Sequence, residues 1–172
     1  VLTKELSKVA KKVVAVELDS RLIPVLKETL ADCSNVEVVN ADILKTDISS
    51  LFPKDAQISV CANLPYYITT PILMYLLESD FNISNITVMV QKETADRLCA
   101  HLGTRECGAI SGAIEYYSEA KKLFDVKASS FIPAPKVDSS VISLKVKKKE
   151  KNKKLFTLIR AAFAERRKTA IN

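Results

Sequence analysis

The sequence has few of the residues and runs that build metal sites, membrane spans or disulfide frameworks. It contains one histidine, and its four cysteines show no CxxC spacing, which argues against a metal site. Its apolar runs are much shorter than the roughly 20 residues that cross a bilayer, and no basic-then-apolar leader marks secretion. We therefore interpret the cysteines as reduced thiols of a cytoplasmic protein that has no membrane or metal partner.

Positive charge is also scarce in most of the chain, because it is concentrated at one end. From Lys145 onward, 11 Lys and Arg stand against 2 acidic residues, a net charge of +9. Residues 1–144 carry the other 15 basic groups and 18 acidic groups, a net charge of −3. A basic end suits a polyanionic partner such as nucleic acid. A solvated basic helix explains the same charge equally well.

Strand-like and helix-like apolar patterns alternate along the chain. Strand-like segments occupy 12–19, 35–43, 57–65 and 85–93, and helical spacing occupies 20–33, 70–79 and 93–102. This alternation predicts an α/β fold with a mostly parallel sheet and helices on both faces. Because segment 12–19 is apolar almost throughout, we expect its strand to be buried on both faces. Segments 121–126 and 138–146 predict two more strands, antiparallel because no long helix separates them.

Carboxylates follow the first two predicted strands, at the edge of a parallel sheet where ligands bind. Glu17 ends the first strand, where its carboxylate can accept hydrogen bonds from two ribose hydroxyls. Asp42 follows the second strand and can accept from the amino group of an adenine ring. Each acid could instead stabilise a helix N-terminus or a cap. Together, on neighbouring strands, the two acids indicate an adenosine-containing ligand.

The third strand ends in Asn63-Leu64-Pro65-Tyr66, the most specific signal in the chain. The exocyclic amine of adenine is a poor nucleophile because its lone pair is delocalised into the ring. The side-chain carbonyl of Asn63 and the backbone carbonyl of Leu64 can both accept from that amine and free its lone pair. Pro65 fixes the loop, and Tyr66 can stack on the base. A strand-to-helix turn with tyrosines half in the core is the structural alternative.

Five segments carry a family resemblance: VVAVELD, NADIL, NLPYYIT, SFIPAPKVDSSV and FAERRKTAIN. They cover almost the whole chain in order, and they resemble the ribosomal RNA adenine dimethyltransferases of the small-subunit type. The resemblance implies a Rossmann-like methyltransferase sheet, mostly parallel with an antiparallel C-terminal strand pair. It also implies S-adenosylmethionine as methyl donor and two successive methylations of adenine amines in small-subunit ribosomal RNA or a pre-ribosomal particle, during ribosome biogenesis.

The resemblance further implies roles for particular residues. The cofactor would contact Glu17, Leu18, Asp42, Ile43 and Asn63. The catalytic set would be Asn63, Leu64, Pro65, Tyr66 and Phe131, with Tyr66 and Phe131 on either side of a flipped base. RNA would contact Tyr67, Lys136, Arg166, Arg167 and Lys168. Taken alone, Phe131 could instead anchor its loop in the core, which is the commoner role of such aromatics.

The chain departs from the family pattern at both ends. None of its three glycines precedes Glu17, so we expect the family's first central strand and its glycine-rich loop to be absent from this sequence. We divide the sequence into an incomplete catalytic domain, 1–148, and a basic helix, 149–172, leading toward an absent helical domain. We expect an incomplete or rearranged sheet centre near Val14 and Val60 and association between copies. The 172-residue chain alone is expected to bind the cofactor weakly or not at all, and to have no methyltransferase activity.

Two functions from other classes compete with this interpretation. A nucleic-acid-binding module, such as a transcription-factor-like relative, could keep the fold without methyl transfer. A nicotinamide-dependent oxidoreductase would also place an acid after its second strand, but it has no use for Asn-Leu-Pro-Tyr. We therefore retain the binding module as the main alternative.

Overall fold

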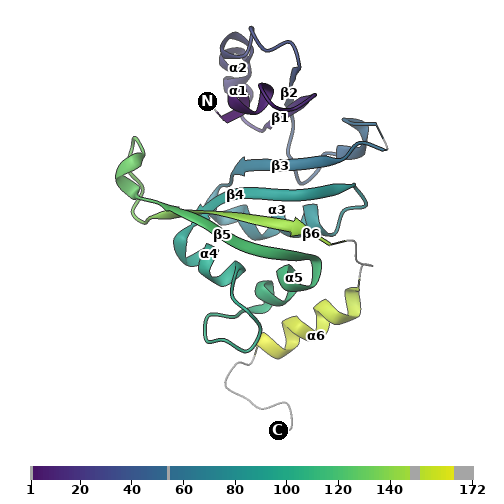
Figure 1. The fold of residues 1–172 in the computed structure, drawn as a ribbon, viewed down its shortest axis with the longest axis vertical. Helices are drawn as coiled ribbons and strands as arrows, with labels where there is room; N and C mark the ends of the chain where they lie inside the picture. The colour runs from purple at the N-terminus through teal and green to yellow at the C-terminus, as the bar shows by residue number, and fades with distance from the viewer. Residues whose placement is uncertain (1, 54, 148–151, 165–172) are drawn as a thin grey trace. The chain divides into compact units, whose positions relative to one another are not determined.

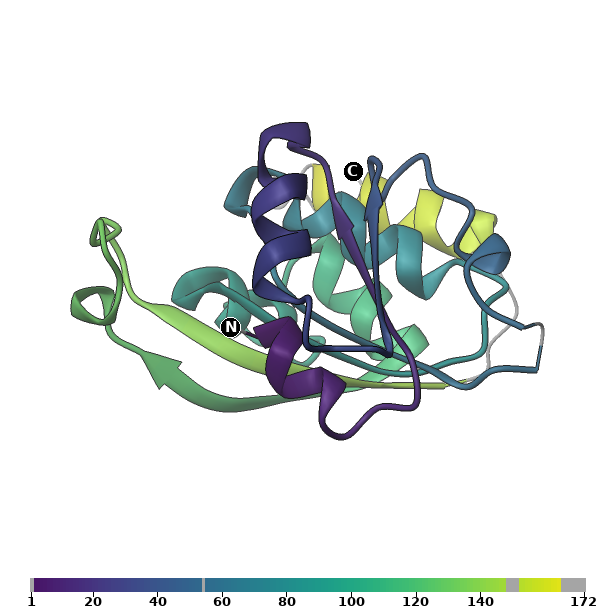
Figure 2. The ribbon, with the colours of Figure 1, turned by 90° about the horizontal axis from the view of Figure 1, so that it is seen from above.

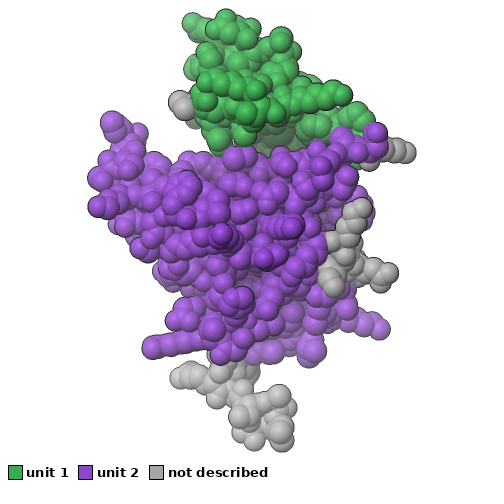
Figure 3. All heavy atoms as spheres, viewed as in Figure 1, with its two compact units in different colours: residues 1–54 green, residues 55–172 purple. Residues whose placement is uncertain are grey.

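The computed structural model describes the chain except for residues 1, 54, 148–151 and 165–172. The chain divides into two compact units, residues 1–54 (unit 1) and residues 55–172 (unit 2) (Figure 3). The predicted basic cluster Arg166, Arg167 and Lys168 lies outside the described residues.

Unit 1 is a small α/β unit with one pair of parallel strands. Its elements are α1 (Leu2–Ser7), β1 (Val13–Glu17), the 3-10 helix η1 (Ser20–Leu22), α2 (Ile23–Thr29), β2 (Val36–Asn40) and η2 (Ile48–Ser50). Strands β1 and β2 run parallel with Glu17 opposite Asn40, so their carboxyl ends meet at one edge. The Asp19 side chain accepts from the Arg21 N–H and caps η1, and Pro24 stands in the first turn of α2, where a missing N–H is tolerated.

The strand predicted to be buried on both faces exists but is not buried. Every residue of β1, from Val13 to Glu17, is half-buried. Among the described residues of unit 1, only Leu30 and Ile48 are buried apolar side chains. A unit of this size has too few elements to cover both faces of an apolar strand, so that part of the prediction is wrong.

Unit 2 contains a four-stranded mixed sheet in the order β3-β4-β6-β5 (Figure 1). Its strands are β3 (Ile58–Asn63), β4 (Ile83–Gln91), β5 (Ser118–Val126) and β6 (Ser139–Val146). Strands β3 and β4 are parallel, whereas β6 is antiparallel to both of its neighbours, β4 and β5. The predicted antiparallel pair at the C-terminal end of the sheet is therefore confirmed.

The helices of unit 2 lie on one face of this sheet (Figure 2). They are α3 (Thr69–Leu77), α4 (Lys92–Leu98), α5 (Ala109–Tyr117) and α6 (Lys153–Ala164), with the 3-10 helices η3 (Tyr66–Ile68) and η4 (Ala128–Ser130) in loops. Alternation along the central strands agrees with a single covered face: Ile86, Val88 and Val90 are buried, whereas Thr87 and Met89 are half-buried. Helices on both faces are thus a wrong prediction for the described part of unit 2. Helix α5 contacts α3, α4 and α6, so all four form one layer.

The strands form two separate sheets instead of one continuous sheet. Strand β1 pairs only with β2, and β3 pairs only with β4, among the residues that the structure describes. Val14 and Val60 lie on these two strands, so the expected incomplete sheet centre is confirmed. Each of the two strands presents backbone N–H and C=O groups along its second edge, and such edges favour pairing with a further strand.

A charged cluster connects the last residues of strand β5 to strand β6 and to the start of helix α4. Asp125 accepts from Ser140 Oγ at 2.7 Å, and the Nζ atoms of Lys92 and Lys122 lie 2.8 and 3.1 Å from its carboxylate oxygens. The hydrogen bond from Lys92, with those from Ser140 and Lys122, holds the pKa of Asp125 well below its usual range. The hydrogen bond to Asp125 likewise raises the pKa of Lys92.

We expect Asp125→Asn to lower stability near neutral pH and to matter little in acid. The pKa of Asp125 in the folded state lies below the unfolded value of about 3.9. At pH values between these two pKa values, the folded state therefore binds fewer protons than the unfolded state. The carboxylate's contribution is therefore complete above the unfolded pKa and is lost as pH falls through the folded pKa. Urea midpoints of wild type and variant should differ at about pH 6 and converge toward about pH 2. An equal difference at both pH values would contradict this, and exposed Asp55→Asn is the control.

Candidate functional site

Glu17 closes strand β1 in a turn that is tied to strand β2. Its Oε1 accepts from the Asp19 N–H at 2.8 Å. The Asn40 side-chain amide donates to the backbone carbonyls of Glu17 and Leu18, at 2.8 and 3.1 Å. Leu18 itself is 64% exposed. The turn thus fixes the Glu17 carboxylate at the strand end and leaves an apolar side chain beside it on the surface.

Asp42 lies two residues beyond the end of β2 in a turn of similar design. Its Oδ1 accepts from the Leu44 N–H at 3.0 Å, and its backbone carbonyl accepts from Thr46 Oγ1 at 2.7 Å. Lys45 Nζ lies 3.8 Å from the Asp42 Oδ2, a loose ion pair. Asp42 and Ile43 are both half-buried.

The two carboxylates of unit 1 share one arrangement that fits an adenosine ligand. In each, a backbone N–H two residues on holds one oxygen and fixes the direction of the carboxyl group. Within the described residues, Oε2 of Glu17 has no hydrogen-bond partner, and Oδ2 of Asp42 has only the loose ion pair. An ionised carboxylate accepts but cannot donate, so these oxygens suit the hydroxyl donors of a ribose and the amino donor of an adenine.

In unit 2, strand β3 ends in Asn63, whose side chain is exposed at the carboxyl edge of the sheet. The next residue, Leu64, is buried, and its N–H donates to the Met89 carbonyl of β4 at 3.2 Å. No hydrogen-bond partner for the Asn63 amide or the Leu64 carbonyl is found among the described residues. Two acceptors on consecutive residues are therefore held at the strand end without a partner among the described residues.

Pro65 carries the chain from this strand end into η3 and α3. Its carbonyl accepts from the Ile68 N–H at 3.2 Å and from Thr69 Oγ1 at 3.1 Å, which fixes the turn. The turn exposes both tyrosines, Tyr66 by 41% and Tyr67 by 82%. Tyr66 is anchored through its hydroxyl, 3.3 Å from Ser139 Oγ at the start of β6.

Phe131 lies in the loop between β5 and β6, directly after η4. Its N–H donates to the Ala128 carbonyl at 3.2 Å, and Asp138 Oδ1 accepts from the Ala128 N–H at 2.9 Å. Phe131 is half-buried and Lys136 is exposed. Asp138 therefore holds the loop at its base, while the Lys136 side chain on the same loop is exposed to solvent.

The predicted residues thus fall into two groups, one in each unit. Unit 1 contains Glu17, Leu18, Asp42 and Ile43, and unit 2 contains Asn63, Leu64, Pro65, Tyr66, Tyr67, Phe131 and Lys136. Sequence reasoning did not assign roles to Asn40, Asp138 and Ser139, whose side chains hold the two groups in place. Asp138 and Ser139 lie within SFIPAPKVDSSV, so the segment itself was the available signal.

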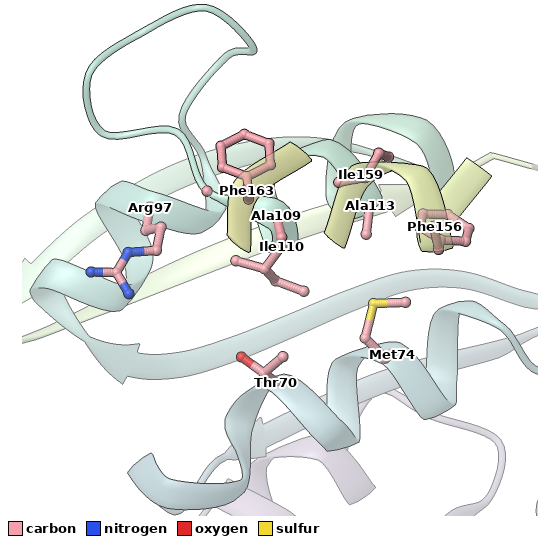
Figure 4. Close-up of a pocket in the computed structure, with 10 residues that line it drawn as sticks. Thr70, Met74, Arg97, Ala109, Ile110, Ala113, Phe156, Ile159 and Phe163 are labelled. Atoms are coloured by element: carbon pink, nitrogen blue, oxygen red, sulfur yellow. The ribbon is translucent and has the colours of Figure 1, made fainter. Parts of the chain in front are cut away.

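A separate pocket of about 510 Å³ lies among the helices of unit 2 (Figure 4). Helix α3 contributes Thr70 and Met74, and the remaining walls come from α4, α5 with Gly108 before it, and α6: Arg97, Gly108, Ala109, Ile110, Ala113, Phe156, Ile159 and Phe163. The pocket is apolar apart from the Thr70 hydroxyl and Arg97, which is paired with Glu93 at 3.0 Å. None of its lining residues was predicted to act in the site.

The described part of the chain shows no metal cluster, disulfide or membrane-spanning helix. It holds no group of three or more His, Cys, Asp or Glu side chains arranged to bind a metal ion. Its four cysteines are free thiols, and burial raises the pKa of Cys61 and Cys99. None of its helices combines the length and the apolar character needed to cross a bilayer.

Comparison with known proteins identifies the family. A family model described as ribosomal RNA adenine dimethylase matches residues 1–172. The chain belongs to the ribosomal RNA adenine dimethylase family. The "Ribosomal RNA small subunit methyltransferase A" of Clostridioides difficile is 49% identical over 180 residues, and that of Shouchella clausii is 48% identical. The chain covers 62% and 61% of these two relatives, and 99% of the chain is matched in each.

Two solved structures are similar to the whole chain. A dimethyladenosine transferase from Plasmodium falciparum has a TM-score of 0.84 and 32% identity, over 98% of this chain and 61% of that one. The 23S rRNA methyltransferase ErmE has a TM-score of 0.79 and 27% identity, over 96% of this chain and 66% of that one. Both comparisons confirm the expected methyltransferase fold of the adenine dimethylase family.

Proposed function

We propose that the protein transfers methyl groups from S-adenosylmethionine to the exocyclic amines of adenines in small-subunit ribosomal RNA, twice on each base. The observation that carries the proposal is the pair of open acceptors at the end of β3, the Asn63 amide and the Leu64 carbonyl, in a chain of this family. The names of the two bacterial relatives support the small ribosomal subunit as the source of the substrate.

The acceptors act on the amine itself. An amine that donates both of its protons, one to Asn63 Oδ1 and one to the Leu64 carbonyl, is drawn toward tetrahedral geometry. Its lone pair then leaves the ring system and becomes available as a nucleophile. Tyr66, on the turn that follows, supports the base by stacking, and Phe131 would cover its other face. The proton lost from the amine passes to water.

Glu17 and Asp42 would hold the cofactor, with Leu18 and Ile43 as apolar contacts beside them. When bound, S-adenosylmethionine supplies a methyl group on a sulfonium whose departing sulfide is neutral, so positioning dominates the rate. Glu17 accepts from ribose hydroxyls through its open oxygen, and Asp42 accepts from the adenine amine of the cofactor.

Methyl transfer to ribosomal subunits tests the proposal directly. The chain spans about three fifths of the relatives' length. The activity assays therefore use the full-length product of the gene that encodes it. With cofactor labelled at the methyl group, we expect label to enter small subunits from undermethylated cells and not large subunits. RNA binding without any incorporation would instead favour the binding module that keeps the fold without chemistry.

The basic C-terminal cluster should supply affinity for RNA. Replacing Arg166, Arg167 and Lys168 by Gln is expected to weaken binding to RNA of any sequence. The slope of log binding constant against log salt concentration should become less steep by up to about three, roughly one for each lost phosphate contact. The matched control replaces Lys4, Lys8 and Lys12, each paired with a carboxylate in unit 1. Binding titrations at several salt concentrations provide the measurement. An unchanged slope in the C-terminal variant would place that cluster away from RNA.

Four further expectations belong to the same proposal. A pre-ribosomal particle is the expected physical form of the substrate, and the cytoplasm the expected compartment. The catalytic domain would be residues 1–148, and the C-terminal segment 149–172 would help to engage RNA through its basic residues. The open edges of β1 and β3 also support association between copies, because exposed inner edges favour pairing.

A further inference from the structure

We propose that Ser139 is a positioning residue: its hydroxyl holds the ring of Tyr66 in the orientation that receives the target adenine. The inference rests on the proposed function, in which Tyr66 stacks on the base. It adds a residue from the start of β6, far along the chain from the Asn-Leu-Pro-Tyr segment, to the set that governs the reaction.

The contact joins an exposed ring to a rigid point of the sheet. Tyr66 is 41% exposed on a short 3-10 turn, and its hydroxyl lies 3.3 Å from Ser139 Oγ. Ser139 is 1% exposed, and its backbone lies between Gln91 of β4 and Val126 of β5. A tyrosine ring on a surface turn has a broad range of χ2 angles, so a fixed partner at its hydroxyl restricts the ring plane.

The residue before Ser139, Asp138, contacts the loop that carries Phe131. Asp138 Oδ1 accepts from the Ala128 N–H at 2.9 Å, at the base of the loop that carries Phe131. The Asp138 carbonyl also accepts from the Lys92 N–H at 3.0 Å, which fixes this point of the chain to the start of α4. Two consecutive residues therefore contact the two segments that carry the aromatic side chains: Ser139 contacts the Tyr66 hydroxyl, and Asp138 binds the backbone at Ala128, three residues before Phe131.

A hydrogen bond between two neutral hydroxyls contributes little free energy, so the expected effects of losing it are small. Losing one neutral hydrogen bond corresponds to about a 3- to 10-fold change. If the pair orients the ring, Ser139→Ala and Tyr66→Phe should each lower kcat by about that factor and change KM for RNA much less. The double variant should be no slower than the slower single variant, because both substitutions remove the same contact.

The product ratio separates positioning from a loss of folded protein. After the first transfer, the amine must present its lone pair again with one methyl already attached, so a loosely held base leaves more often at this stage. Both variants should therefore release a larger share of monomethylated adenine at low conversion. An unfolded fraction lowers the amount of active enzyme but changes neither this ratio nor KM.

The neighbouring residue Ser140 provides a matched control for Ser139→Ala. Ser140→Ala removes an equally buried hydroxyl that bonds Asp125 at 2.7 Å, and it should lower stability without changing the product ratio. Tyr66→Phe keeps the exposed ring and carries no risk to folding. Additive losses in the double variant, or an unchanged product ratio in active single variants, overturn the role of Ser139 alone. Absence of methyl transfer by the wild type overturns the proposed function and this inference with it.

Discussion

Asn63→Ala is expected to lower the rate of methyl transfer at least about a hundredfold, the scale of losing one positioned polar group in a transition state. The remaining acceptor, the Leu64 carbonyl, cannot draw both amine protons, so the lone pair stays in the adenine ring. Single-turnover methyl transfer with saturating cofactor and RNA measures the effect on the chemical step. Affinity for S-adenosylmethionine should change by only a few-fold, since the amide acts mainly on the acceptor base.

The control for this variant lies at the opposite end of the same strand pair. Asn82, whose carbonyl accepts from the Ile58 N–H at 2.9 Å, precedes β4 and can be changed to Ala without touching the carboxyl edge. Asn82→Ala should retain nearly full activity. Near-normal turnover by Asn63→Ala would contradict the proposed activation of the amine, even though the family fold would still stand.

Glu17→Ala is expected to have the second largest effect, this time on cofactor affinity. A hydrogen bond to a charged group is worth about 1.5–3 kcal/mol, so losing even one of those to the ribose hydroxyls should weaken binding at least about tenfold. The turn should survive, because the Asn40 amide still donates to the backbone carbonyls of residues 17 and 18. With enough cofactor present, kcat should stay within a few-fold of wild type.

Isothermal titration of S-adenosylmethionine into the wild-type protein and the Glu17→Ala variant measures the change in dissociation constant. Glu37→Ala is the matched control, because Glu37 is a carboxylate of strand β2 whose side chain pairs with Lys12 at 2.8 Å. An unchanged dissociation constant for Glu17→Ala would mean that the strand-end acid only stabilises its own turn. The Asn63 and Glu17 variants therefore affect different quantities, rate and affinity, and one set of assays separates them.

The strands and their order along the chain could be predicted because their signals are local. The apolar runs around Val38, Val60 and Val88 are short and bounded by polar turns, and each became a strand. The acids and the amide at the strand ends, Glu17 and Asn63, could also be placed, because the carboxyl edge of a parallel sheet follows from topology alone.

Contacts between distant segments could not be predicted in this way. The hydroxyls of Tyr66 and Ser139 are 73 residues apart in sequence, and no local pattern pairs them. The burial of β1 also depends on what covers the strand, which an apolar run such as Val13–Val16 does not specify. The single helical layer of unit 2 depends likewise on how α5 packs on α3 and α4.

The nucleoside that receives the methyl groups tests the central claim most directly. Undermethylated small subunits are incubated with the full-length protein and cofactor carrying a deuterated methyl group, and the digested RNA is examined by mass spectrometry. The account predicts adenosine with two labelled methyl groups on its exocyclic amine, and almost none with the Asn63→Ala variant. Label on any other nucleoside, on a ring carbon of adenine, or on none would contradict it.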